Sequence, residues 1–161
     1  MRTIDILAQS LQFNRVRTLG LLAAIEQDAR PQEVLAWRPG PKRAHIAWQL
    51  MHIGITEELF ATERLMPDKV GEFQELWPRF RGGSTPDDLI PSAHEIRTVL
   101  NQTREHLLDT LSRYSDEQLT VVPAAFKERG LTFRDVLHLI AFHEAHHQGQ
   151  AHITLNLYRN R

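Results

Sequence analysis

The chain of 161 residues contains no cysteine. A disulfide scaffold, a thiolate zinc site and a cysteine nucleophile are therefore all excluded. Any bound metal ion must take nitrogen or oxygen ligands, and nine histidines and 20 acidic residues are present to supply them. Because cysteine is missing, the histidines are the first candidates for metal ligands.

Long hydrophobic runs and a surplus of charge are also missing. Uninterrupted apolar stretches last only a few residues, far short of the roughly 20 that span a bilayer, and no signal-peptide block opens the chain. The net charge is −1, and no dense run of lysine and arginine indicates nucleic-acid binding. We therefore expect a cytoplasmic protein with a small-molecule substrate and with neither a membrane nor a nucleic-acid partner.

Four stretches of helical periodicity fill most of the chain, and no stretch has the alternation of a strand. Two of them begin with the spacing of a helix cap, Ser92 with Glu95 and Thr132 with Asp135. No repeat or linker divides the chain, so we expect one domain over residues 1–161. The pattern predicts an all-α fold, a four-helix bundle. The expected helices cover approximately residues 4–27, 42–65, 92–114 and 132–158.

Two connections, residues 70–91 and 115–130, are long. The first contains a Gly-Gly pair and three prolines, which predicts a loop with at most a helical turn. Connections of this length argue against a simple up-and-down order of helices. We expect substrate contacts to come from the open end of the bundle and from residues 70–91.

Five of the nine histidines fall within the last predicted helix. His143 and His147 are four residues apart, so they project from one face. The same stripe holds Val136, Ile140 and Leu157, and we expect it to face the core. Buried imidazoles need partners, which are either hydrogen bonds to side chains and water or a divalent metal ion.

A third ligand is expected from another helix. His52 lies within an apolar stretch on the predicted inward face of helix 42–65. His45, expected to be exposed near the start of that helix, and His146, at the edge of the last helix, are the alternatives. His52, His143 and His147 are therefore the predicted metal ligands. The remaining histidines, expected at the surface or without a matching partner, are His94, His106, His138 and His152.

Three histidines without a fourth protein ligand describe an open site, in which water or substrate completes the coordination. Imidazole ligands suit several divalent ions. We expect zinc or nickel, with iron or manganese as the other candidates.

His143–His147 also matches the H-E-x-x-H pattern of metalloproteases. The longer form of that pattern requires a glycine three residues after the second histidine, but Gly149 comes two residues after it. No strand is predicted that would hold an extended peptide. The protease interpretation is therefore disfavoured, and Glu144 is expected to be a solvated or supporting carboxylate in preference to a catalytic base.

Three stretches together resemble the DinB/YfiT-like superfamily: Ala-Trp-Arg-Pro-Gly at 36–40, His-Ile-Ala-Trp-Gln-Leu-Met-His at 45–52 and His-Glu-Ala-His-His-Gln-Gly-Gln at 143–150. The resemblance implies a four-helix bundle, frequently a homodimer, that binds a divalent metal ion. Matched residue by residue, its ligands are His52, His143 and His147. The superfamily includes S-transferases that use low-molecular-weight thiols, mycothiol-dependent isomerases and members without an established substrate.

The sequence thus leads to a metal-dependent enzyme, in particular a low-molecular-weight-thiol-dependent S-transferase. Three alternatives stay open at this point. They are a metal-dependent hydrolase, a non-enzymatic metal-binding bundle with a stress-related role, and a metal-free bundle with hydrogen-bonded core histidines.

Overall fold

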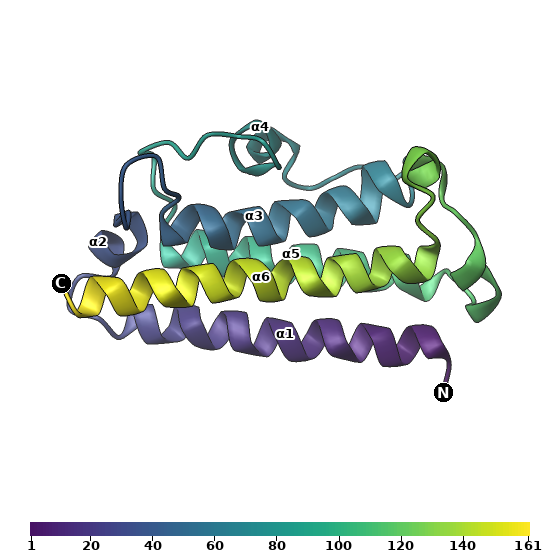
Figure 1. The fold of residues 1–161 in the computed structure, drawn as a ribbon, viewed down its shortest axis with the longest axis horizontal. Coiled ribbons are helices and arrows are strands. Elements are labelled where there is room, and N and C mark those ends of the chain that lie inside the picture. Colours follow the sequence, from purple (N-terminus) through teal and green to yellow (C-terminus); the bar gives the residue numbers. More distant parts are fainter.

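A computed structural model describes residues 1–161 as an all-helical protein without strands. Four long helices form a bundle, which confirms the predicted fold class (Figure 1). They are α1 (Thr3–Glu26), α3 (Ile46–Leu59), α5 (Ala93–Ser112) and α6 (Phe133–Arg159). The short helices between them are α2 (Pro31–Ala36), η1 (Phe60–Arg64), η2 (Gln74–Leu76), α4 (Trp77–Phe80), η3 (Asp116–Thr120) and η4 (Ala124–Arg129).

Each long helix packs against two others, since α1 and α3 both contact α5 and α6. α1 and α6 run in one direction and α3 and α5 in the opposite one (Figure 1). The connection from α3 to α5 therefore returns along the length of the bundle, and the order of helices is not simply up-and-down, as expected. The connection from α5 to α6 stays at one end.

The helix starts follow from their caps. Ser92 and Glu95 form the expected capping box of α5, and Thr132 and Asp135 form that of α6. The second long helix starts later than the prediction of residue 42. His45 is its N-cap, because the Nδ1 atom of its ring accepts a hydrogen bond from the backbone N–H of Trp48.

All 14 residues of α3 are buried, although only one face was expected to be. The reason is residues 70–91, here called the strap, which lie over the side of α3 that faces away from the bundle (Figure 1). Polar side chains of α3 bind the strap's backbone: Trp48 donates from Nε1 to the carbonyl of Arg79, and a carboxylate oxygen of Glu58 accepts from the N–H of Glu72. These bonds satisfy polar groups that burial would otherwise leave without a partner.

The close contact between α3 and α5 depends on Gly54. A Cβ atom at this position would lie 2.8 Å from a methyl carbon of Val99. The missing side chain thus allows the two parallel helices to approach closely.

The hydrophobic core has two parts, a cluster of 20 buried residues and a second cluster of 13. Four buried charged residues, one from each long helix, meet in a network within the bundle. Arg15 bonds Glu57 and Glu144, each at 2.8 Å, and Arg104 bonds the same two carboxylates. Two positive and two negative charges therefore neutralise one another out of contact with water.

The network favours the ionised form of Glu57. Burial raises the cost of charging Glu57, but the charges of Arg15 and Arg104 outweigh that cost and hold its pKa below the ordinary value. Glu144 has a further donor, the hydroxyl of Thr18 at 2.8 Å. Each carboxylate is thus fully engaged within the protein.

None of the helices combines the length and the apolar character that a membrane span requires.

Replacement of Arg104 by methionine should destabilise the fold, because Glu57 and Glu144 would each lose a buried counter-charge. Removing one partner of a buried ion pair costs about 3–5 kcal/mol, and we expect a loss of about that size in the free energy of unfolding measured by urea denaturation. The matched control is Arg113→Met in the exposed pair with Asp109, for which the expected loss is below about 1 kcal/mol. Similar losses in the two variants would contradict the proposed role of the network.

Candidate metal centre

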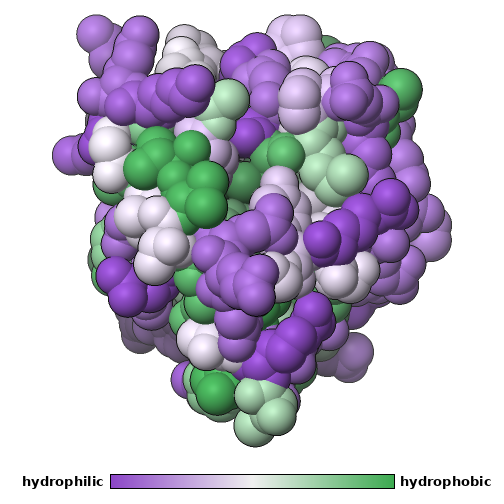
Figure 2. Space-filling model, turned by 90° about the vertical axis from the view of Figure 1, so that its right-hand side faces the viewer, coloured by the Kyte–Doolittle hydropathy of each residue, from purple (hydrophilic) through white to green (hydrophobic).

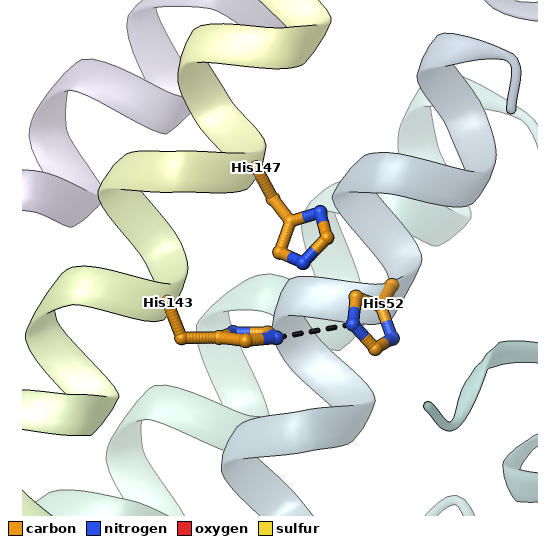
Figure 3. A group of neighbouring side chains, drawn as sticks. All are labelled: His52, His143 and His147. Atoms are coloured by element: carbon orange, nitrogen blue, oxygen red, sulfur yellow. Dashed lines mark hydrogen bonds between the residues drawn. The ribbon is translucent and has the colours of Figure 1, made fainter. Parts of the chain in front are cut away.

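The three predicted ligands lie together. His52 comes from α3, and His143 and His147 come from neighbouring turns of α6, which runs antiparallel to α3 beside it (Figure 3). One ring nitrogen from each histidine lies within 4.8 Å of the other two, and no fourth histidine or carboxylate belongs to the group. The Nε2 atoms of His52 and His143 are 3.0 Å apart.

The ring of His52 is held on two sides. Its Nδ1 atom donates a hydrogen bond of 2.6 Å to the backbone carbonyl of Phe80 in the strap. The indole of Trp48 stacks on the ring, with centroids 4.6 Å apart and an interplanar angle of 12°. Because Nδ1 carries the proton, Nε2 of the neutral ring presents a lone pair to the group.

His147 is oriented in the same way by a side chain. Its Nδ1 atom donates a hydrogen bond to Oε1 of Gln49, 2.5 Å away. The other ring nitrogen is then free to act as an acceptor or ligand, as is common where a histidine binds a metal ion. Two of the three imidazoles therefore have a fixed tautomer.

The histidines are neutral at physiological pH. Burial, reinforced by the charges of the neighbouring histidines and Arg64, lowers the pKa of His143 to about 3. Burial together with His52 and His146 lowers the pKa of His147 to about 4. The pKa of His52 is also lowered, mainly by burial. Neutral imidazoles are the form that binds metals.

This donor set fits a divalent metal ion. Two nitrogens on one tetrahedral zinc ion lie about 3.3 Å apart, since zinc–nitrogen bonds measure about 2.0–2.1 Å. The 3.0 Å separation between His52 and His143 is close to that value. Without an ion, the neutral ring of His143 can donate a hydrogen bond from Nε2 to Nε2 of His52. A divalent ion would instead take a lone pair from each of the three imidazoles.

Comparison with known proteins identifies the family and the fold. The sequence profile of the DinB superfamily matches residues 10–151. The chain belongs to the DinB superfamily. A crystal structure of a conserved protein from Enterococcus faecalis has the same fold, with a TM-score of 0.72 and 15% identity over 100% of this chain and 99% of that chain. No curated protein matches the sequence.

The other histidines of this DinB-superfamily chain do not join the group. His45 is buried and not exposed as expected, because its ring caps α3 through Nδ1 and donates from Nε2 to the carbonyl of Asp87 in the strap. His146 is exposed and contacts Gln150. His138 and His152 are exposed, as expected from their position on α6.

Glu144 is not solvated, so that part of the expectation for it was wrong. It is buried, and Arg15, Arg104 and Thr18 bind its two carboxylate oxygens. Its position next to His143 turns it about 100° around the helix, toward α1 and α5. Its carboxylate is therefore not free to act as the general base that the glutamate of the H-E-x-x-H pattern supplies in metalloproteases.

The inward stripe of α6 also differs from the expected one. Leu157 is half exposed, whereas Tyr158 and Leu155 are buried. Glu144 lies on the buried stripe with Ile140, and His143 and His147 lie at its edge, where they are half-buried and face α3. The i, i+4 spacing shows that the two histidines share a face, but it does not show that this face lies at the edge of the buried stripe.

Two groups that orient the site were missed from the sequence. Gln49 could have been noticed, because it is a lone amide in an apolar stretch one turn before His52. The carbonyl of Phe80 has no signal in the sequence, since every residue has one. Only the path of the strap brings that carbonyl to the ring of His52.

Without metal, the protein should lose stability as the pH falls from about 6.5 to about 4. The unfolded chain protonates histidine near pH 6.5, whereas the folded state keeps His143 and His147 neutral to much lower pH. The unfolded state therefore binds more protons over this interval, and acid favours unfolding. We expect the thermal midpoint of metal-free protein to fall over this range and to fall less in His143→Gln, while the exposed-site control His138→Gln behaves like the wild type. If the thermal midpoint falls with decreasing pH equally in the wild type and in His143→Gln, the burial of a neutral His143 is not the cause of the acid sensitivity.

Proposed function

We propose that this chain is a divalent-metal-dependent enzyme that transfers a low-molecular-weight thiol to an electrophilic small molecule. His52, His143 and His147 are the proposed ligands, and zinc or nickel is the proposed ion. The proposal is supported by one observation above all, the convergence of three neutral imidazoles from two helices with no fourth protein ligand. Catalytic zinc sites have three protein ligands, whereas structural sites have four.

A divalent ion in such a site lowers the pKa of a thiol or water in its open position. The chain's own residues hold the site in place: Gln49 and the carbonyl of Phe80 retain the Nδ1 protons of His147 and His52. Trp48 closes one side by stacking on His52, and its indole edge faces His147 at 6.4 Å.

Thiol transfer suits the surroundings better than hydrolysis does. Hydrolytic metalloenzymes commonly use a carboxylate as general base for water. The buried carboxylates nearby, Glu57 and Glu144, are fully bound by arginines, and the exposed Glu63 lies 3.6 Å from Arg81. A thiol, with an ordinary pKa of about 8.5, needs much less activation than water. Its thiolate sulfur forms the new bond to an electrophilic carbon while the leaving group departs with the bonding electrons.

The remaining expectations stay predictions: a homodimer, a cytoplasmic location and a small-molecule substrate without a nucleic-acid partner. The absence of cysteine from the chain is compatible with thiol transfer, because the cosubstrate supplies the sulfur.

Metal content tests the ligand assignment directly. We expect protein purified without a histidine tag and dialysed against zinc to hold about one ion per chain, and the double variant His52→Ala/His143→Ala to lose it. The matched control is His138→Ala/His152→Ala, which removes two exposed histidines from α6 and should bind zinc like the wild type. Equal zinc content in all three proteins would refute the assignment and favour a metal-free bundle.

Turnover tests the reaction class. Zinc- or nickel-loaded protein should accelerate the consumption of a chromogenic electrophile by at least one member of a panel of low-molecular-weight thiols. The ligand double variant should return the rate to that of free thiol, because the thiol would keep its solution pKa. Tight metal binding without turnover for any thiol would instead support the non-enzymatic metal-binding role. Metal-dependent ester cleavage without a thiol would support the hydrolase.

A further inference from the structure

We infer that Arg64 and the cavity it lines bind a small organic anion, held on the guanidinium through a carboxylate or phosphate group. This inference goes beyond the proposed function, because none of the three histidines lines that cavity. It starts from an arginine that has no partner within the protein.

Arg64 differs from every other arginine of restricted exposure. It is half-buried, yet its guanidinium forms neither a hydrogen bond nor an ion pair with any residue of the chain. All other buried or half-buried arginines bind a carboxylate: Arg15, Arg38, Arg79, Arg97 and Arg104. A guanidinium offers five donors in a planar fork that matches a carboxylate or phosphate. Its free donors are therefore available to a ligand.

The guanidinium is held in position by aromatic packing. It lies over the ring of Phe60, 4.4 Å from the centroid, and that ring stacks on Phe126 of η4. Arg64 ends η1, the π-helical turn that follows α3, and such turns occur frequently at functional sites. Because the side chain is seated on a ring, it needs little ordering when an anion binds.

The surroundings of Arg64 are positively charged. Burial and the positive charges of Arg81 and Arg129 lower the pKa of Arg64, with Glu63 as the opposing acid. Three arginines and one glutamate thus give this region a positive charge in a chain whose net charge is −1. Such a local field attracts anions.

Arg64 lines a largely apolar cavity. It has a volume of about 320 Å³ and seven of its 12 lining residues are hydrophobic, among them Leu65, Val122 and Phe133. Figure 2 shows this end of the molecule, where hydrophobic residues are exposed among hydrophilic ones. A ligand with its anionic group on Arg64 can place a short hydrocarbon part here, which favours an organic anion over a bare inorganic one.

Binding of simple anions tests this inference without a known substrate. Wild type, Arg64→Gln and the exposed-site control Arg17→Gln are titrated with hexanoate, acetate, inorganic phosphate and the neutral hexanol at constant ionic strength, and binding is followed by NMR chemical shifts. Each titration is done on metal-free and on zinc-treated protein. Arg64→Lys, which keeps the charge but not the fork, is added in case Arg64→Gln does not fold.

We expect hexanoate to bind the wild type more tightly than acetate does, and to bind Arg64→Gln about ten- to a hundredfold more weakly. Arg17→Gln should match the wild type, hexanol binding should not depend on Arg64, and Arg64→Lys should lie between wild type and Arg64→Gln. Preferential, Arg64-dependent binding of phosphate would identify the anionic group as a phosphate. Equal hexanoate binding by the wild type and Arg64→Gln, or no anion binding by the wild type, would overturn the inference.

The zinc content of the same samples separates the two proposals. If wild-type protein takes up no zinc, the proposed function fails, while the role of Arg64 is still decided by the metal-free titrations. If Arg64→Gln binds zinc like the wild type but loses hexanoate, Arg64 acts on the ligand and not on the metal site.

Discussion

A network of four charged residues holds the bundle together at its centre. Arg15, Glu57, Arg104 and Glu144 each come from a different long helix, and every carboxylate binds both arginines. Apolar contacts tolerate small slides and rotations of a helix, but a buried charge must meet its counter-charge. The network therefore selects one rotation and one register for each helix, at a desolvation cost that apolar residues would not incur.

The histidine site depends on that choice. Glu144 is bonded toward α1 and α5, and this orientation turns the neighbouring His143 toward α3. On the other side, Glu57 fixes α3 through the two arginines, five residues beyond His52. Rigid elements position functional groups more accurately than loops do. The four charges thus set the distance at which the imidazoles meet, although none of them contacts a histidine ring.

The strap also orients the histidine site, in addition to the charged network. α3 carries polar side chains on the face that would otherwise be exposed, and they bind backbone groups of residues 70–91. One of these side chains is His52, whose bond to Phe80 determines which ring nitrogen is free. In the same segment, Nη2 of Arg81 lies 3.6 Å from a carboxylate oxygen of Glu63, the residue before Arg64. Covering α3 and shaping the site are therefore done by one segment.

The sequence by itself determined the helices, the bundle and the three histidines. Caps such as Ser92 and Thr132, the 3.6-residue period and the spacing of His143 and His147 are local properties, and local patterns survive any packing. Only the tertiary structure decided which residues surround the histidines. Glu144 is a core residue because arginines from two other helices neutralise its charge. His45 is buried because the strap covers it. Arg64 differs from the other arginines of restricted exposure because no residue of the chain forms an ion pair with it. Burial and pairing of a charge depend on residues distant in the chain, and hydrophobic periodicity carries no information about them.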